Sequence, residues 1–358
     1  MIIKTAKYKY MNIDDIRTTI IGFGSVIIIF AALFAFAGVE ELIATVRTAN
    51  PQYVALVIGA TLTWLFAWSV SLHTVLQTLD VHLSYAASFL VFAGAMFSNN
   101  VTPFGQAGGE PITAYLISRT ADAEYETSLA AIASVDTLNL IPSITIALIG
   151  VGYFTTEVAL GSRSNILLGS IVVITLATTI LIFAYAAWRY RYEIEHRVVH
   201  ALAPMIHWVA DIVPRLPDIA EAEIETRIEG FFRAIERVAA NPRQLAVALG
   251  ASTIGWICQM TALWLAFRAI GIELRTTFIL IIVPIATIAG VTPLPGGAGG
   301  IETVLVFLLL AAPLPHVTEA IAVTAVVIFR GAIYWVPVIL GGGVVAWISS
   351  GANIGSPN

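Results

Sequence analysis

The chain has 358 residues, of which 58% are hydrophobic and 11% are charged, and its mean hydropathy is +0.87. This composition excludes a soluble globular protein and indicates a multi-pass protein of the cell (cytoplasmic) membrane, since several apolar stretches reach the roughly 20 residues of one bilayer crossing. The net charge of −5 leaves the orientation open, because sidedness depends on where Lys and Arg lie. The longest polar interval, 189–243, is too short for a catalytic domain, so we expect no enzyme activity.

A first membrane helix is predicted over residues 17–38. Basic residues precede this apolar run, which is too long for the core of a signal peptide, and no small-residue cleavage site follows it. We therefore expect an uncleaved helix whose N-terminus lies in the cytoplasm.

Residues 51–150 predict a first repeat that consists of a crossing helix, a re-entrant hairpin over 84–118 and a second crossing helix. The two arms of the hairpin offer about 15 and about 8 helical residues, which reach only about 22 and about 12 Å, so neither arm spans a bilayer. Between the arms lies the sequence VTPFGQAGGE at residues 101–110. A further crossing helix is predicted over 166–188.

A charged cytoplasmic linker is predicted over residues 189–243. Within it, apolar side chains recur at helical spacing and indicate an amphipathic helix that lies on the membrane surface or on the helix bundle. These side chains are Ile224, Ile228, Phe231, Phe232, Ile235 and Val238.

Residues 244–348 predict a second repeat, in which a hairpin over 277–311 lies between two crossing helices. Its break, VTPLPGGAGGIE at residues 291–302, begins about 190 positions after the first break. Both breaks keep Val-Thr-Pro, a Gly-rich turn, Gly-Gly and then an acid. Paired interrupted segments of this kind point to a substrate site.

The distribution of basic residues gives the orientation. Thirteen of the 18 Lys and Arg fall in segments assigned to the cytoplasm: four before residue 18, Arg119, and eight in the linker. This bias follows the positive-inside rule. The predicted fold class is an all-α membrane protein with about six spanning helices, two re-entrant hairpins in an inverted repeat, and both termini in the cytoplasm. Inverted repeats are typical of transporters that work by alternating access.

Three motifs resemble those of the lysylphosphatidylglycerol synthase transmembrane, or flippase-like, family. They are the Pro-Gly-Gly-x-Gly-Gly-x-Glu break from Pro295 to Glu302, the segment from Asn99 to Pro111, and Arg330 with Tyr334, Trp335 and Pro337 in the last helix. The resemblance covers nearly the whole chain and implies an eight-segment bundle with two re-entrant hairpins. It also implies movement of polar-headed lipids or lipid-linked sugars between leaflets, by a stand-alone member without the aminoacyl-transferase domain.

Four ionisable residues fall inside predicted membrane segments, where such residues are costly and mark candidate sites. Glu110 and Glu302 begin the second hairpin arms, where an acid suits the start of a helix; alternatively, one of them binds a cation, a proton or an amino headgroup. Asp136 and Arg330 lie at matching depths, 26 and 28 residues further on. Arg330 either forms a structural ion pair with Asp136 or binds a lipid phosphate, and Glu302 would then neutralise it between transport events.

The breaks supply further candidate substrate-binding residues. Their glycines allow close approach of a ligand or tight packing of the hairpin tips, and their polar side chains line a wet cavity or bond between helices. These candidates are Asn99, Asn100, Thr102, Gln106, Gly108, Gly109, Thr292, Gly296, Gly297, Gly299 and Gly300, with Asn139 as a further polar residue. The histidines show no metal-ligand spacing, and neither a metal nor another cofactor is predicted.

We therefore predict a protein that translocates a phosphate-bearing phospholipid or a polyprenyl-phosphate-linked lipid, with no nucleic-acid partner. A second hypothesis is a secondary transporter of a small solute or ion, which needs a sealed wall where a lipid transporter needs a lateral opening. A third hypothesis is a membrane partner of a separate lipid-modifying or glycosyl-transfer enzyme, docked through the linker.

Overall fold

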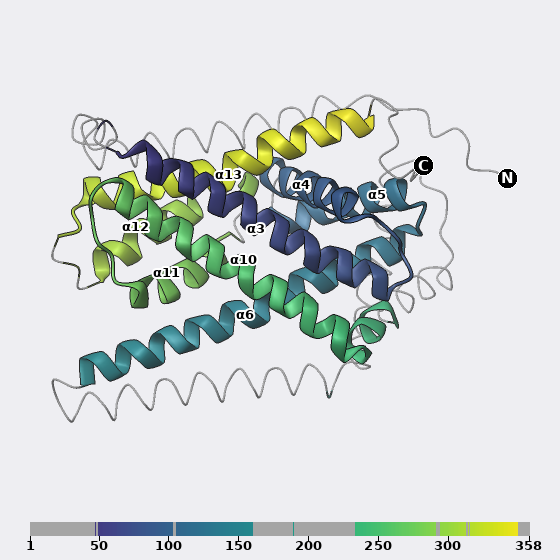
Figure 1. Ribbon diagram of the computed structural model, residues 1–358, viewed down its shortest axis with the longest axis horizontal. Coiled ribbons are helices and arrows are strands. Elements are labelled where there is room, and N and C mark those ends of the chain that lie inside the picture. Colours follow the sequence, from purple (N-terminus) through teal and green to yellow (C-terminus); the bar gives the residue numbers. More distant parts are fainter. Residues whose placement is uncertain are drawn as a thin grey trace, which may run out of the picture.

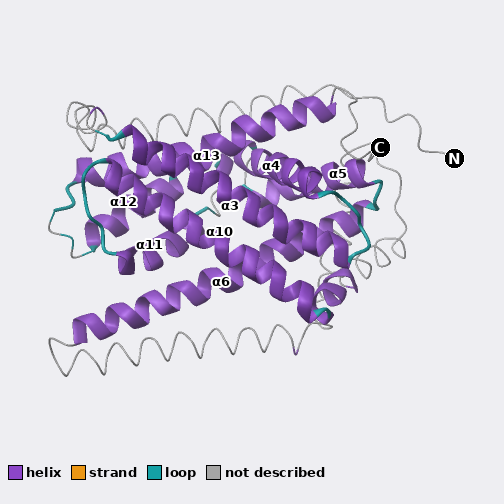
Figure 2. Cartoon of the chain, in the orientation of Figure 1, coloured by secondary structure: helices purple, strands orange, loops and turns teal. Residues whose placement is uncertain are grey.

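Helices make up every regular element that the structure describes. The computed structural model describes residues 49–102, 105–159, 233–290, 294–312 and 316–349, together with residues 47, 189 and 314. Figure 2 shows helices joined by short loops, and no strand, in these ranges. The predicted all-α architecture is confirmed for this part of the chain, whereas the predicted helices over 17–38 and 166–188 lie outside it.

Within the described ranges, four helices are long and apolar enough to cross a membrane: α3 (Pro51–Thr78), α6 (Tyr125–Ala159), α10 (Pro242–Ala269) and α13 (Glu319–Ser349). Helices α3 and α10 open the two predicted repeats and begin in the same way. Asn50 and Asn241 each accept a hydrogen bond from a backbone N–H of the first turn, and each is followed by Pro. This Asn-Pro start favours a helix, because the Asn oxygen satisfies a free N–H and Pro has none to leave unsatisfied.

Helices α3 and α10 pack against one another along the middle of the molecule (Figure 1). They approach closely because Gly255 of α10 faces the ring of Trp68, where a Cβ atom would collide with the indole. The Trp68 indole N–H donates to the carbonyl oxygen of Ser252 at 3.2 Å. The Trp256 indole N–H donates to the carbonyl oxygen of Asn139 on α6 at 2.8 Å. These contacts join α3, α6 and α10 at the centre of the apolar core.

The remaining labelled elements form two hairpins. The first consists of α4 (Tyr85–Val101) and α5 (Gln106–Ala121); the second consists of α11 (Thr276–Ile288), the short 3-10 helix η1 (Pro295–Gly297) and α12 (Gly300–Ala311). The four α-helices contain 17, 16, 13 and 12 residues. At 1.5 Å per residue, each is shorter than the roughly 30 Å thickness of the hydrocarbon core. Figure 1 shows the hairpins toward opposite ends of the long axis.

The second arm of the first hairpin is longer than predicted. We expected about eight residues starting near Pro111, because Gly108 and Gly109 resemble a chain break. Instead α5 begins at Gln106, directly after Gly105, whose φ of 56° is left-handed. Gly109 lies inside the helix because Asn99 of α4 occupies the space that a Cβ atom would take. This glycine therefore permits close packing of the two arms and does not end the helix.

The described end of the predicted linker helix packs on the bundle. Residues 233–240 are helical, and Ala234 and Val238 are buried in the apolar core. Arg237 Nη1 lies 3.5 Å from Asp80 Oδ2, which follows α3. This part of the chain therefore rests on protein; the rest of the predicted amphipathic helix lies outside the described residues.

Candidate functional site

Arg330 of α13 and Glu302 of α12 form a buried ion pair. Arg330 Nε donates to Glu302 Oε1 at 2.6 Å, and the two side chains are 7% and 1% exposed. Two charges removed from water are stable only when their geometry is close and their other polar atoms are also bonded. Arg330 Nη2 accordingly donates to the carbonyl oxygen of Gly296 at 3.2 Å, and Glu302 Oε2 accepts from the N–H of Gly299 at 2.6 Å.

The second oxygen of Glu302 caps α12. Gly299 directly precedes the helix, and its N–H donates to the carboxylate of Glu302, three residues later. This bond is one of the two that make up a capping box. The negative charge also lies at the positive end of the helix dipole. The predicted helix-start role is therefore confirmed for Glu302, which holds Arg330 and the first turn of α12 at the same time.

A left-handed glycine carries the backbone carbonyl that bonds to Arg330. Gly296 has a φ of 59°, a conformation that glycine adopts without steric strain. A Cβ atom on Gly296 would lie 2.7 Å from Asn100 Oδ1 and 2.7 Å from Tyr334 Cε2. The tip of the second hairpin is therefore pressed against α4 and α13, with no room for a side chain.

The two repeats meet beside the ion pair. The Tyr334 hydroxyl donates to the carbonyl oxygen of Asn100 at 2.9 Å, and the Asn100 side-chain amide donates to the carbonyl oxygen of Tyr334 at 3.3 Å. The Arg330 guanidinium lies 5.6 Å from the centre of the Tyr334 ring, within cation–π range. A Cβ atom on Gly105 would lie 3.6 Å from the carbonyl oxygen of Gly290. The tips of both hairpins thus come together around Arg330.

In the first repeat, the corresponding pair consists of two acids. Glu110 of α5 and Asp136 of α6 are neighbouring acids, and both are half-buried. Glu110 is the fifth residue of α5 and makes no cap, so the helix-start interpretation is wrong for it. The alternative of an ion pair between Asp136 and Arg330 is wrong, because Arg330 pairs with Glu302.

Several of the predicted polar residues bond between or within helices. Asn139 Oδ1 accepts from the Ser252 hydroxyl at 2.6 Å and so connects α6 to α10. The Thr102 hydroxyl donates to the carbonyl oxygen of Ser98 at 2.7 Å, at the end of α4. Thr292 lies outside the described residues, as does the side chain of Gln106.

The glycines of the second break serve mainly to bring backbone into contact. A Cβ atom on Gly297 would lie 2.6 Å from the Cα atom of Gly290. Gly300 begins α12, and Gly108 lies in the first turn of α5. Sequence reasoning missed Gly290 and gave Tyr334 no role of its own. Tyr334 could have been found from its position four residues after Arg330, because residues four apart lie on the same face of a helix.

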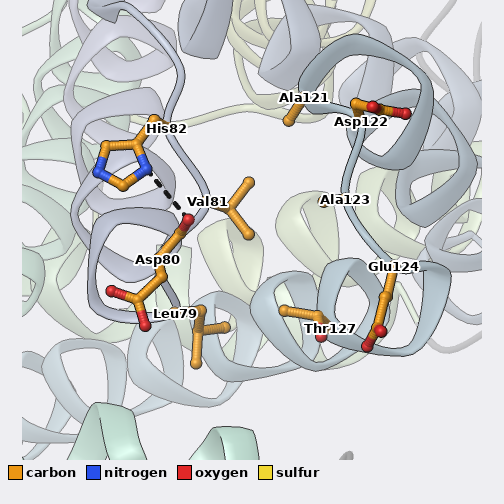
Figure 3. A pocket seen from close by; sticks show the side chains of 9 residues that line it. All are labelled: Leu79, Asp80, Val81, His82, Ala121, Asp122, Ala123, Glu124 and Thr127. Carbon is orange, nitrogen blue, oxygen red and sulfur yellow. Dashed lines mark hydrogen bonds between the residues drawn. The ribbon is translucent and has the colours of Figure 1, made fainter.

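A cavity of about 310 Å³ lies elsewhere, between the α3–α4 and α5–α6 loops (Figure 3). Its lining is acidic, with Asp80, Asp122 and Glu124, and His82 Nδ1 lies 3.0 Å from the carbonyl oxygen of Asp80. None of the predicted site residues lines it. Within the described ranges, no group of three or more His, Cys, Asp or Glu side chains is arranged to hold a metal ion. This cavity therefore lies away from the buried ion pair.

Comparison with known proteins gives a consistent result. The sequence profile of the lysylphosphatidylglycerol synthase TM region matches residues 20–341. A UPF0104 membrane protein of Methanothermobacter thermautotrophicus is 24% identical over 335 residues, which are 91% of this chain and 94% of that protein. A UPF0104 membrane protein of Pyrococcus horikoshii is 26% identical over 319 residues, 87% of this chain and 91% of that protein. The phosphatidylglycerol lysyltransferase of Bacillus subtilis is 34% identical over 124 residues, 34% of this chain and 14% of that protein.

Proposed function

The chain belongs to the lysylphosphatidylglycerol synthase transmembrane family, and from this premise we propose that it moves a phosphate-bearing lipid between leaflets, with Arg330 binding the headgroup phosphate. The observation that carries this proposal is the place of the buried ion pair. Arg330 and Glu302 lie where the tips of the two hairpins meet. In transporters built from inverted repeats, the substrate binds at the interface between the interrupted segments.

The guanidinium of Arg330 suits a phosphate ligand. Its planar fork presents parallel N–H groups to two phosphate oxygens, and it stays charged under all physiological conditions. In the described part of the chain, Nε bonds to Glu302 and one Nη2 N–H bonds to Gly296. Since an arginine carries five N–H groups, others remain for an incoming anion.

Glu302 supports an exchange of partners at Arg330. Its Oε1 bonds to Arg330, whereas its Oε2 bonds to the N–H of Gly299. When a phosphate displaces the carboxylate from Arg330, Glu302 keeps the bond to Gly299 and the favourable end of the helix dipole. Glu302 then returns once the lipid has left. Arg330 is paired in both states, which avoids the large penalty of an unpaired buried charge.

The outer faces of α12 and α13 suit the tails of a lipid. Trp335 and Ile339 of α13 are 53% and 70% exposed, and Phe307 of α12 is 67% exposed. Trp335 follows Arg330 by five positions, and Phe307 follows Glu302 by five positions. Apolar surface therefore lies within two helical turns of the ion pair. A lipid whose tails remain in the bilayer beside these residues can place its headgroup at Arg330, which favours a lipid over a free solute.

Translocation is tested with purified protein in liposomes that contain phosphatidylglycerol labelled on one tail with nitrobenzoxadiazole. Dithionite bleaches only outer-leaflet dye, so a protein that moves lipid exposes dye from the inner leaflet. The Arg330→Gln/Glu302→Gln variant removes both charges and keeps amide side chains of similar size. We expect bleaching in wild-type vesicles to exceed that in protein-free vesicles, and bleaching with this variant to match the protein-free level.

The exposed pair of Arg268 and Glu273 provides the matched control, since its atoms are 3.0 Å apart but it lies outside the site. The Arg268→Gln/Glu273→Gln variant is expected to behave as wild type. Normal lipid movement by Arg330→Gln/Glu302→Gln would contradict the role of Arg330. A wild-type protein that moves no labelled lipid but takes up inorganic phosphate would instead identify a solute transporter.

A further inference from the structure

A lipid headgroup can reach Arg330 only through an opening between helices, because Arg330 lies inside the protein. The side chains of Arg330 and Glu302 are 7% and 1% exposed, and the tips of both hairpins lie around them. The tails of a lipid stay in the bilayer because apolar chains avoid water. The headgroup therefore has to pass sideways between two helices, and the contacts around Arg330 identify these helices.

Tyr334 holds α13 to the end of α4. Its hydroxyl donates to the carbonyl oxygen of Asn100 at 2.9 Å, and the Asn100 amide donates back to the Tyr334 carbonyl oxygen at 3.3 Å. Asn100 lies in the last turn of α4, where backbone carbonyl groups lack a partner within the helix. The seam between α4 and α13 is therefore held here by two bonds between neutral groups, each of which contributes little on its own.

Contacts of Tyr334 also lead from the ion pair to the surface of the bundle. The Arg330 guanidinium lies 5.6 Å from the centre of the Tyr334 ring, and the ring centres of Tyr334 and Trp335 lie 5.4 Å apart. Tyr334 is 7% exposed, whereas Trp335 is 53% exposed. This line of contacts ends at the apolar surface that suits the lipid tails.

The two helices are packed differently on the other side of Pro337. A Cβ atom on Gly341 of α13 would collide with the carbonyl oxygen of Ala93, which lies seven residues before Asn100 on α4. Small residues allow two helix backbones to approach this closely in a membrane. Helices α4 and α13 are thus in backbone contact after Pro337 and are bonded through a side-chain hydroxyl and an amide before it.

Pro337 provides a hinge between these two parts of α13. It lies inside the helix and has no N–H to donate to the carbonyl oxygen of Ile333. Sharp bends in helices occur mostly at such positions. A bend at Pro337 moves Tyr334 and Arg330 relative to α4, while the contact at Gly341 stays closed.

We propose that the contact between Tyr334 and Asn100 is a lateral gate, through which the lipid headgroup reaches Arg330 when α13 bends at Pro337. Opening breaks the two hydrogen bonds between Tyr334 and Asn100, and closing restores them. The gate rests on the proposed function, since it admits the lipid to that site. Opening of the seam is nevertheless measurable without any lipid movement.

Alkylation of a thiol at position 330 measures this opening. In Arg330→Cys/Glu302→Gln protein that also carries Cys258→Ser, the new thiol is buried, and N-phenylmaleimide dissolved in the bilayer reaches it when the gate opens. Tyr334→Phe removes one of the two bonds of the gate. We expect it to make the alkylation about fivefold faster, as the loss of one hydrogen bond of usual strength gives.

A thiol at position 325 is the matched control, because Ala325 is fully buried on the same helix. In Ala325→Cys/Cys258→Ser protein, Tyr334→Phe should leave the alkylation rate unchanged. A purely structural role of Tyr334 would loosen the whole fold and accelerate both thiols equally. That result, or an unchanged rate at position 330, would overturn the gate.

A covalent bridge across the seam tests the gate during lipid movement. Dibromobimane joins two thiols through thioether bonds, which dithionite does not reduce. Asn100→Cys/Tyr334→Cys protein with Cys258→Ser is assayed with the tail-labelled phosphatidylglycerol before and after bridging. Bridging should reduce bleaching to the level of protein-free vesicles.

The control bridge joins the same helices beyond Pro337. A Cβ atom on Gly94 of α4 would lie 3.5 Å from Val345 Cγ2 of α13, so Gly94→Cys/Val345→Cys brings two thiols together there. Bridging this pair should leave lipid movement unchanged. Movement that continues after the bridge at the gate, or that stops after either bridge, would overturn the proposal. If wild type moves no labelled lipid, the proposed function fails, and the alkylation rates still decide whether the seam at Tyr334 opens.

Discussion

Tyr334 of α13 and Asn100 of α4 bond each other in both directions, although they are 234 positions apart and belong to different repeats. The hydroxyl of one residue and the side-chain amide of the other each reach the partner's backbone carbonyl. The contact joins the last described helix of the second repeat to the hairpin of the first, beside Arg330. It fixes the closed arrangement in which Arg330 is covered by the hairpin tips.

Removing the Tyr334 hydroxyl should weaken this junction. Tyr334→Phe deletes the 2.9 Å bond to the Asn100 carbonyl oxygen. We expect the free energy of unfolding in detergent to fall by about 1 kcal/mol, the usual net contribution of such a bond. Tyr125→Phe is the control, because the Tyr125 hydroxyl makes a longer, 3.4 Å bond to Pro111 at an exposed position. Equal losses of unfolding free energy in the two variants would show that the bond from Tyr334 to Asn100 stabilises the protein no more than an exposed hydrogen bond does.

A side chain on Gly296 should disrupt the hairpin tip. The left-handed φ of 59° and the atoms 2.7 Å from a Cβ position both oppose Gly296→Ala. We expect this variant to lose about 1–3 kcal/mol of stability, as strained backbone positions do. Gly343→Ala on α13 has no atom within 4 Å of the added carbon, so it should leave stability unchanged or raise it by up to about 1 kcal/mol. Thermal unfolding of both variants checks this difference in sign.

A side chain added where α3 and α10 approach most closely should destabilise the protein. Gly255→Ala places a carbon atom against the Trp68 indole, which is also bonded to Ser252. Overpacking of this kind typically destabilises by about 1–3 kcal/mol. Gly250→Ala on the same helix meets nothing within 4 Å and serves as the control. Retained stability of Gly255→Ala would mean that the two helices separate easily.

The effect of removing the charge of Arg330 on the stability of the protein should depend on whether Glu302 is still charged. Arg330→Gln alone leaves Glu302 as a buried carboxylate, and we expect a loss of about 3–5 kcal/mol. Adding Glu302→Gln removes that charge, so the double variant should be more stable than the single one. Unfolding of the wild type, both single variants and the double variant gives the interaction energy directly. Additive effects would contradict a coupled pair.

Much of the fold followed from the sequence. Apolar length predicts the helices, and the repeated Val-Thr-Pro followed by a Gly-rich turn predicts the two hairpins. The sequence spacing also placed Glu110 with Asp136, and Glu302 with Arg330, at corresponding positions. These features are local, so periodicity and turn chemistry are enough to find them.

The contacts of Arg330 and the start of α5 did not follow from the sequence. Depth alone suggested Asp136 as the partner of Arg330, but depth does not say which faces of two helices meet. Glycine at 108 and 109 suggested a break, whereas Gly109 makes room for Asn99 inside a helix. Both outcomes depend on how helices pack, which a single sequence does not encode in its spacing.

The central claim is that Arg330 binds the phosphate of a lipid, and lipid mass spectrometry on gently purified protein tests it most directly. Wild-type protein should retain a phosphate-bearing lipid that is enriched over the surrounding membrane, and Arg330→Gln/Glu302→Gln should lose that enrichment while Arg268→Gln/Glu273→Gln keeps it. A wild-type lipid profile identical to that of the bulk membrane, or enrichment that survives in Arg330→Gln/Glu302→Gln, would contradict the claim.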